Sequence, residues 1–246
     1  MDDLMNQVLY QLDDASLAFP PIEGALTEPN GLLALGGDLS PERLIEAYSQ
    51  GIFPWYEESQ PILWWSPEPR TVLNPQDVYI NRSLRKALRR EDYSVSFDRA
   101  FNDVLDGCAE LSPKRPGTWI TDDMRTAYRA LHQQGWAHSV EVWREERLIG
   151  GLYGMGIGEV FFGESMFSRE ANASKIALVH LCGQIQEWGY PLIDCQVGND
   201  YLDNMGAQEI AREKFRQHLS VYTNLPGRPV ANWTMNWRYG QKTLAE

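Results

Sequence analysis

The sequence predicts an α+β protein with a small N-terminal domain (residues 1–75) and a larger C-terminal domain (residues 76–246). The first 75 residues carry one turn signal after another, which indicates short elements joined by loops. Between residues 138 and 197, stretches with a period of two surround one helical stretch, as is typical of a mixed α/β domain. With 246 residues, of which 43% are hydrophobic, the chain can bury a sizeable core.

Charge and cysteine content restrict the class of protein. Twenty-two Lys and Arg residues against 34 Asp and Glu residues give a net charge of -12, so any nucleic-acid site must be local. Three cysteines without C-x-x-C spacing favour a reducing compartment over a disulfide framework or a thiolate zinc site. The start lacks signal-peptide features and no apolar run approaches the roughly 18 residues of a membrane span, so we expect a soluble, cytoplasmic protein with no membrane partner.

Capping signals predict two helices in the first half of the chain. Ser40 is a suitable N-cap, Pro41 suits the first helical position, and Gly51 ends the pattern. A second helix is expected over 122–134, capped by Thr121, with its apolar residues on one face.

A change of period predicts strands further along the chain. The expected strands are 138–143, 147–153 and 159–163. Glycines at 154, 156 and 158 are expected to separate the last two, which suggests an antiparallel meander. A helix over 175–188 then leads into a buried strand over 192–197.

Asp194 and Gln196 lie two residues apart in that last strand and are therefore expected on one face. Burying a carboxylate beside an amide is costly unless both are hydrogen-bonded, so the pair belongs either to a structural network or to a functional site. Cys195 is expected to point the opposite way, as an inert buried thiol.

One stretch departs from the acidic character of the chain. Five basic residues at helical spacing, with no acid among them, are expected on one face of a helix over 81–90. They are Arg82, Arg85, Lys86, Arg89 and Arg90. Such a face matches a ladder of phosphates and predicts a nucleic-acid contact, whereas a solvated face paired with acids elsewhere is the alternative.

Tryptophans and one carboxylate are further candidates. Trp55 and Trp119 lie in loop-rich segments, where indole rings either pack in the core or form platforms on which bases stack. Glu164, at the end of a strand, is either a surface carboxylate or the receptor for a substrate cation. The four histidines lack metal-ligand spacing, so we predict no metal site.

Long motifs along nearly the whole chain resemble the leucyl/phenylalanyl-tRNA–protein transferases. The matching segments are 19–20, 28–40, 51–55, 64–67, 117–121, 137–141, 162–168, 172–175 and 192–196. The resemblance implies a small N-terminal domain packed on a GNAT-like domain, similar to that of N-acetyltransferases. It also implies a leucyltransferase that moves Leu or Phe, and less readily Met, from aminoacyl-tRNA to the N-terminal Arg or Lys of acceptor proteins, which creates an N-end-rule degradation signal.

The resemblance also implies roles for individual residues. Tyr48, Trp55 and Trp119 would flank the 3′ adenosine and the aminoacyl group. The basic residues at 82–90, found from their charge pattern, suit the acceptor stem of the tRNA. The apolar pocket for the Leu or Phe side chain would consist of Leu152, Met166, Leu178, Leu181 and Ile193. The family often has Met and Phe where this chain has Leu152 and Leu181, which bears on the preference among Leu, Phe and Met.

An aminoacyl ester is already activated, so the implied reaction needs no metal or cofactor. Gln196 would contact the acceptor amine, Asp194 would orient or charge it, and Glu164 would help hold the cationic acceptor end. Two mechanisms stay open: Asp194 polarises Gln196 as a proton relay, or Gln196 only orients the amine. We expect a monomer.

Two other functions are alternatives to the transferase. An acyl-CoA-dependent GNAT acyltransferase would need a Gln/Arg-x-x-Gly-x-Gly/Ala loop, which is absent from 168–175. A non-catalytic adaptor for tRNA or protein N-termini would keep the basic face and the pocket without turnover. A thioacyl enzyme on Cys195 is a further mechanism, and the last segment, 226–246, is not assigned.

Overall fold

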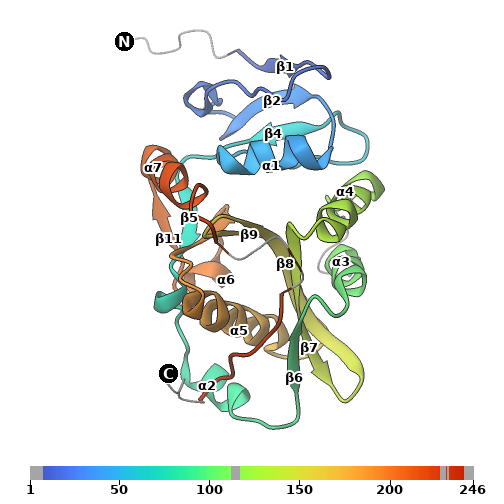
Figure 1. The fold of residues 1–246 in the computed structure, drawn as a ribbon, viewed down its shortest axis with the longest axis vertical. Coiled ribbons are helices and arrows are strands. Elements are labelled where there is room, and N and C mark those ends of the chain that lie inside the picture. Colours follow the sequence, from blue (N-terminus) through green and yellow to red (C-terminus); the bar gives the residue numbers. More distant parts are fainter. Residues whose placement is uncertain (1–7, 112–116, 228–230, 232, 241–246) are drawn as a thin grey trace.

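The computed structural model describes residues 8–111, 117–227, 231 and 233–240. A small sheet forms one end of the molecule and a larger sheet forms its body (Figure 1). The small sheet has the order β1-β2-β4-β3 and is covered by α1 (Pro41–Ser49). Its strands are β1 (Tyr10–Leu12), β2 (Leu32–Gly36), β3 (Phe53–Pro54) and β4 (Leu63–Trp65).

The larger sheet has the order β11-β5-β10-β9-β8-β7-β6. Its strands are β5 (Arg70–Leu73), β6 (Ser94–Phe97), β7 (Ala137–Arg144), β8 (Arg147–Ile157), β9 (Val160–Ser168), β10 (Leu192–Gln196) and β11 (Gln208–Ile210). Only β9 and β10 pair in parallel within this described sheet. Their pairing ends at Phe162 and Asp194, so the two strands separate beyond these residues.

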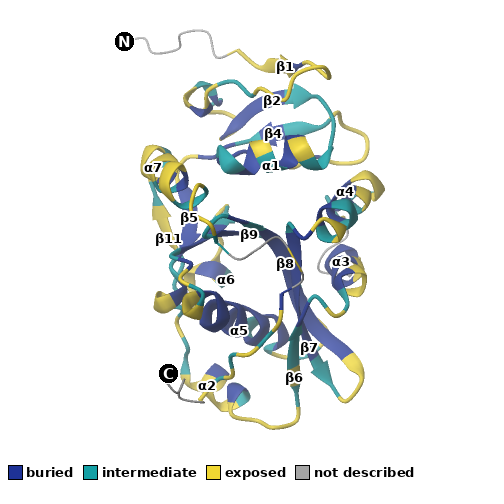
Figure 2. Ribbon diagram, viewed as in Figure 1, coloured by how far each residue is buried: buried dark blue, intermediate teal, exposed yellow. Residues whose placement is uncertain are grey.

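Helices cover both faces of the larger sheet. The remaining helices are α2 (Arg82–Leu88), α3 (Phe101–Ala109), α4 (Asp122–Gln133), α5 (Ala173–Glu187), α6 (Asp200–Asp203) and α7 (Arg212–Tyr222), with 3-10 turns η1 (Ile22–Gly24) and η2 (Pro75–Asp77). α3 and α4 pack on one face and α5 on the other. α5 is buried along most of its length (Figure 2), as expected of a helix that is apolar around its circumference. Among the described residues, no helix is long and apolar enough to span a bilayer.

The α+β class is confirmed, and so are both predicted helix starts. Ser40 Oγ accepts a hydrogen bond from the backbone N–H of Arg43 at 3.4 Å, and Thr121 Oγ1 accepts one from Met124 at 3.2 Å. These bonds satisfy N–H groups that the first helical turn leaves without partners. β5 (Arg70–Leu73), which falls within the expected N-terminal domain (residues 1–75), pairs with β10 and β11 of the larger sheet. We propose a boundary between residues 65 and 70.

Two glycines expected between strands lie inside one. Gly154 and Gly156 belong to β8, and the turn to β9 lies at Gly158, whose φ is +56°. A Cβ at Gly154 would lie 2.1 Å from the carbonyl oxygen of Phe162, and one at Gly156 would lie 2.7 Å from the Trp233 ring. Close approach of neighbouring groups, rather than a turn, therefore requires glycine at both positions.

The basic helix is shorter than predicted. α2 ends at Leu88, Arg89 is its C-cap, and the Arg90 guanidinium pairs with Asp92. The prediction of one helical face with five basic residues is therefore wrong for Arg89 and Arg90, which follow the end of the helix. All five basic side chains are exposed, and Leu84 and Leu88 are buried as expected.

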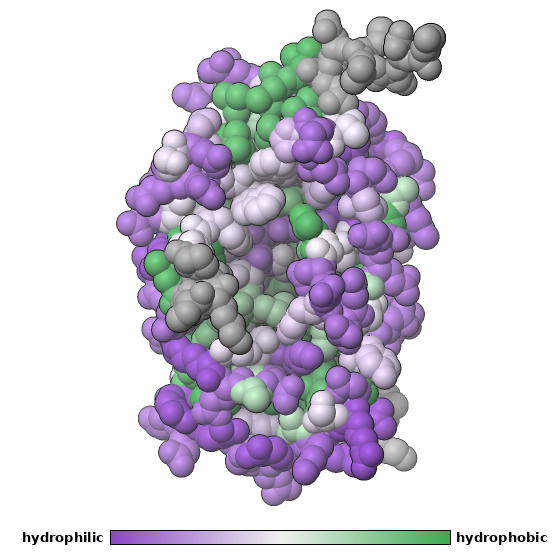
Figure 3. Space-filling model, turned by 180° about the vertical axis from the view of Figure 1, so that it is seen from behind, coloured by the Kyte–Doolittle hydropathy of each residue, from purple (hydrophilic) through white to green (hydrophobic). Residues whose placement is uncertain are grey.

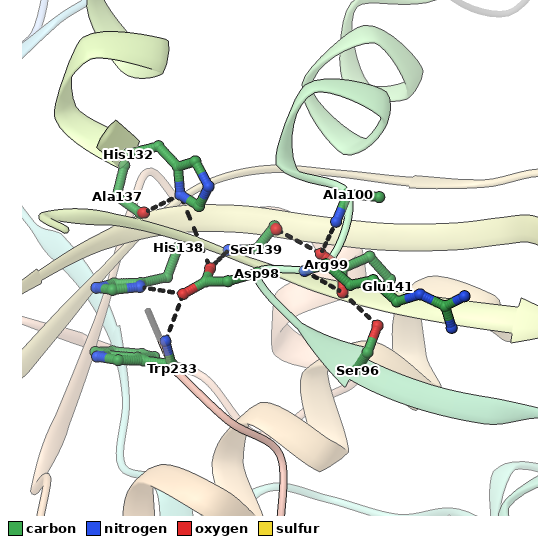
Figure 4. Close-up of polar contacts among 10 residues, drawn as sticks. All are labelled: Ser96, Asp98, Arg99, Ala100, His132, Ala137, His138, Ser139, Glu141 and Trp233. Atoms are coloured by element: carbon green, nitrogen blue, oxygen red, sulfur yellow. Dashed lines mark hydrogen bonds and ion pairs between the residues drawn. The ribbon is translucent and has the colours of Figure 1, made fainter. Parts of the chain in front are cut away.

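Two buried carboxylates attach other segments to the edge of the sheet (Figure 4). Asp98 accepts hydrogen bonds from His138 Nδ1 at 2.8 Å and from the backbone N–H of Trp233 at 2.6 Å. The His138 and Trp233 rings stack with centroids 3.7 Å apart. Glu141 accepts from the backbone N–H of Ala100, the N-cap of α3, at 3.4 Å, and burial raises its pKa to about 7. Residues 233–237, part of the segment that the sequence left unassigned, are thus held on the core.

Apolar surface lies at the end of the molecule that carries the small sheet (Figure 3), where several of the first described residues expose their side chains. They are Val8, Leu9, Tyr10 and Leu17. This edge of the small sheet is remote from the splayed ends of β9 and β10 (Figure 1), so it takes no part in the site described next.

Candidate active site

A cavity of about 570 Å³ opens where β9 and β10 separate. Phe53 and Trp55 contribute to its wall from the N-terminal domain, and Trp119 from the segment before α4. β8, β9, β10 and α5 supply the rest of the lining. Both domains therefore build one site.

Glu164 and Gln196 enter this cavity from irregular positions in neighbouring strands. The register of β9 against β8 shifts between Tyr153 and Gly154, where Glu164 is left unpaired. The register of β10 against β5 shifts between Asp194 and Gln196, and Gln196 has a φ of +63°. Because β-bulges redirect side chains, the two residues meet, and Gln196 Nε2 donates to Glu164 Oε1 at 2.8 Å.

Two tyrosines complete a cage around the Glu164 carboxylate. The hydroxyl of Tyr48 donates to Oε1 at 2.7 Å, and that of Tyr128 donates to Oε2 at 2.9 Å. The two hydroxyls also form a short hydrogen bond with each other. An ionised Glu164 leaves two phenolic protons for three oxygen–oxygen contacts, and a proton taken up by Glu164 would supply the third, with one phenol then accepting from the carboxyl group.

Burial raises the pKa of Glu164 to about 7, and the nearby charge of Asp194 adds to this effect. Donation from Tyr48, Tyr128 and Gln196 opposes it by stabilising the carboxylate. Burial, and then the charge of Glu164, raise the pKa values of Tyr48 and Tyr128 well above their usual range. Both phenols stay protonated at neutral pH, whereas Glu164 exchanges a proton there.

Asp194 and Gln196 do not share a face of β10, and that prediction is wrong. The Asp194 carboxylate accepts hydrogen bonds from Arg70 Nε at 2.8 Å, from Arg70 Nη2 at 2.6 Å, and from the backbone N–H of Gln196 at 3.0 Å. Asp194 is fully buried behind the cavity, while the side chain of Gln196 turns to Glu164. The bulge between the two residues breaks the alternation on which the expectation depended.

Comparison with known proteins identifies the family. The profile described as leucyl/phenylalanyl-tRNA protein transferase matches residues 72–220, and the profile for the N-terminal domain of that protein matches residues 37–68. The chain belongs to the leucyl/phenylalanyl-tRNA protein transferase family. The resemblance seen in the sequence is thereby confirmed.

Individual relatives match nearly end to end. The leucyl/phenylalanyl-tRNA–protein transferase of Ectopseudomonas mendocina is 55% identical over 92% of this chain and 99% of its own length. The one from Nitrosomonas europaea is 56% identical over 90% of this chain and 93% of its own length. Among solved structures, a GCN5-related N-acetyltransferase from Kribbella flavida aligns with a TM-score of 0.37 and 12% identity, over 70% of this chain and 61% of that one.

Most site residues implied by the likeness to leucyl/phenylalanyl-tRNA protein transferases lie in the cavity wall. They are Trp55, Trp119, Leu152, Glu164, Met166, Leu178, Leu181, Ile193 and Gln196. Trp55 is 46% exposed, and the four aliphatic residues at 152, 178, 181 and 193 are buried. The cavity therefore has a deep apolar end and an aromatic contribution from the N-terminal domain.

Two expected positions need correction. Tyr48, expected beside the adenosine, is fully buried and reaches the site through its hydrogen bond to Glu164. Cys195, expected to point away from Gln196, lines the same cavity because of the bulge, and burial raises the pKa of its thiol. The basic residues of α2 lie at the end of the molecule remote from the small sheet (Figure 1).

The sequence reasoning missed Arg70 and Tyr128. Tyr128 is a buried residue of α4, and a buried phenol needs a hydrogen-bond partner, which was the available signal. Arg70 pairs with a residue 124 positions away, so no local pattern indicates it. In the described part of the chain, no three His, Cys, Asp or Glu side chains gather in a way that could hold a metal ion.

Proposed function

We propose that this chain transfers Leu or Phe, and less readily Met, from aminoacyl-tRNA to the α-amine of proteins that begin with Arg or Lys. The product would carry an N-end-rule degradation signal. The supporting observation is a deep apolar cavity with a carboxylate of pKa about 7 and an amide at its side. Membership of the leucyl/phenylalanyl-tRNA protein transferase family supports the same reaction.

Glu164 is the proposed proton acceptor. The amine nitrogen attacks the ester carbonyl carbon, an amide bond forms, and the ester bond to the tRNA ribose oxygen breaks. The proton lost by nitrogen passes to Glu164 and then to the departing ribose oxygen. A carboxylate with a pKa of about 7 suits both steps at neutral pH.

Gln196 is the proposed amine-binding residue. Its Nε2 donates to Glu164, which leaves its carbonyl oxygen to accept a hydrogen bond from the acceptor amine. This arrangement favours orientation of the amine over the relay, because the Asp194 carboxylate contacts the backbone of Gln196 instead of its side-chain amide. An α-amine has a pKa of about 7.7–8.0, so an appreciable neutral fraction is available for attack.

The direct experiment is mass spectrometry of an Arg-initiated peptide incubated with the purified protein and Leu-tRNA. A Gly-initiated peptide is the control, and no metal or CoA is added. We expect the Arg-initiated peptide alone to gain one leucyl residue. If the tRNA bound but neither peptide gained mass, the adaptor function would replace the transferase. If a peptide gained an acyl group only in a separate reaction supplied with acyl-CoA, the acyltransferase alternative would replace it.

The apolar end of the cavity is the proposed pocket for the Leu or Phe side chain. Leu178→Phe adds volume at a buried position of this wall. We expect kcat/KM to fall about 10-fold more for Phe-tRNA than for Leu-tRNA, because one or two extra carbons in an apolar pocket discriminate by this order. Val221→Phe, on the exposed side of α7, serves as the control. Equal losses with both tRNAs would contradict the assignment.

The five basic residues at 82–90 are the proposed contact for the tRNA acceptor stem, because the phosphates of the tRNA are the negative charges that a cationic surface binds. Reversing Arg85 and Arg89 to Glu is expected to weaken tRNA binding and to lower the slope of log K against log salt by about one per lost phosphate contact. Arg216→Glu on α7 is the matched surface control. Binding curves that are unchanged at every salt concentration would exclude this surface.

The pKa of Glu164 has a consequence for stability that needs no substrate. Its folded pKa of about 7 exceeds the ordinary value of 4.5, so its contribution is full below about pH 4.5 and is lost as the pH rises through about 7. Glu164→Gln lacks this titration. The melting temperature of the variant, relative to that of the wild type, should therefore increase as the pH rises from about 5 to about 8. Thermal melts by circular dichroism test this, and a difference independent of pH would contradict the raised pKa.

We further propose that the enzyme acts as a monomer in the cytoplasm. The cavity is built from both domains of one chain, so a single copy holds all the residues proposed for the reaction. Light scattering during size-exclusion chromatography, run alongside the transfer assay, tests the monomer.

A further inference from the structure

Arg70 lies where three parts of the molecule meet. Its guanidinium is fully buried and forms a bidentate ion pair with Asp194, which is also fully buried. The guanidinium carbon lies 4.9 Å from the ring centroid of Phe53, in the N-terminal domain, and 4.6 Å from that of Phe215, on α7. Phe53 itself lines the cavity. Arg70, on β5, therefore joins β10 to the N-terminal domain and to α7.

The contacts of Asp194 limit what its charge can do. Both carboxylate oxygens accept from Arg70, and Oδ1 also accepts from the backbone N–H of Gln196. A carboxylate held by a guanidinium fork is neutralised locally and fixed in position. Asp194 therefore acts on Gln196 through its position, by the hydrogen bond to the backbone, while its charge contributes to the raised pKa of Glu164.

The backbone of Gln196 needs such support. Its φ of +63° is sparsely populated by residues other than glycine, and the surrounding structure must hold it there. The hydrogen bond from its N–H to Asp194 Oδ1, at 3.0 Å, is a contact that does so. This backbone conformation directs the side-chain amide to Glu164, at 2.8 Å.

We propose that Arg70 is a positioning residue for the transfer reaction. It clamps Asp194, which fixes the bulge and thereby aims the Gln196 amide at Glu164 and the acceptor amine. Asp194 serves as the anchor of this bulge and not as an electrostatic relay. The inference rests on the proposed function, since its effect is read in the rate of transfer.

The test replaces the ion pair by a neutral pair of similar shape. Asp194→Asn alone and Arg70→Met alone each leave one buried group without its partner, and we expect each to lower kcat by about 100-fold. In the double variant, Asn at position 194 still accepts from the Gln196 N–H and no buried charge is left. We expect its kcat to recover to within about 10-fold of the wild type. A double variant as inactive as Asp194→Asn would show that the charge itself is required and would overturn the proposal.

A second measurement uses a variant that keeps the buried positive charge. Arg70→Lys loses the bidentate geometry, and we expect a lower kcat with unchanged KM for both substrates. In a Gln196→Ala background the same change should have no further effect, because Arg70 acts through Gln196. If the loss of kcat in the combined variant were the sum of the two single losses in free energy, the proposal would be overturned. This result would count even if the variant with the neutral pair did not fold.

Controls separate this proposal from the function on which it rests. Arg216→Met removes an exposed arginine of α7 and should leave kcat at the wild-type value. A wild-type protein that transfers no leucine would refute the proposed function itself. Active wild type with an inactive, folded double variant would refute only the role given to Arg70.

Discussion

Glu164→Gln is expected to lower the turnover of leucyl transfer by about 10²–10⁴-fold, the range for loss of a general base. The amide has nearly the same shape and still accepts from Tyr48 or Tyr128, but it takes no proton from the amine. Affinity for Leu-tRNA should change by less than about 3-fold, since the aminoacyl side chain binds at the apolar end of the cavity. Single-turnover transfer and filter binding measure the two quantities separately.

Glu159→Gln, on the turn that joins β8 to β9, is the matched control for this variant. It should keep the wild-type rate. If Glu164→Gln transferred leucine at a rate within about 3-fold of the wild type, another group or the substrate itself would have to accept the proton. Substrate assistance, with Gln196 as the orienting residue, would then be the remaining mechanism.

Gly154→Ala should destabilise the protein by about 3 kcal/mol or more, at the upper end for added volume in a packed region. The new Cβ would lie 2.1 Å from the carbonyl oxygen of Phe162 and 2.7 Å from the Phe161 ring. A backbone carbonyl in a paired strand cannot move aside as a flexible side chain can. Denaturant unfolding measures the change, and we expect β8 and β9 to lose their register if the variant folds at all.

Gly117→Ala is the control for this substitution, because a Cβ there meets no atom within 4 Å. Its stability should be close to that of the wild type. A Gly154→Ala variant as stable as Gly117→Ala would mean that β8 and β9 are farther apart in solution than in the structure described here.

Much of the fold was predictable where local rules act. Ser40 and Thr121 cap helices as their sequence positions suggest, and the alternating stretches on either side of Glu145 form β7 and β8. The prediction was wrong at Gly154 and Gly156, because a glycine required by a close neighbour looks the same in sequence as a glycine in a turn. It was also wrong at the end of α2, where pairing of Arg90 with Asp92 accompanies the exit from the helix.

The sequence predicted most residues of the candidate site but not how their side chains contact one another. Most of its residues follow from family motifs, yet their contacts cross long stretches of chain, such as 116 residues between Tyr48 and Glu164. The bulges that turn Glu164 and Gln196 toward each other leave no pattern in the sequence. For the same reason the sequence suggested that Asp194 acts on the Gln196 side chain, whereas Arg70 holds it.

The most direct measurement is a crystal structure with 3′-leucylamino-3′-deoxyadenosine, in which an amide replaces the reactive ester. We expect the leucyl side chain between Leu178, Leu181 and Ile193, and its carbonyl carbon within reach of an amine held by Gln196 and Glu164. A leucyl group bound elsewhere, or one whose carbonyl lies on the far side of Trp55 from Glu164, would contradict the active site proposed here.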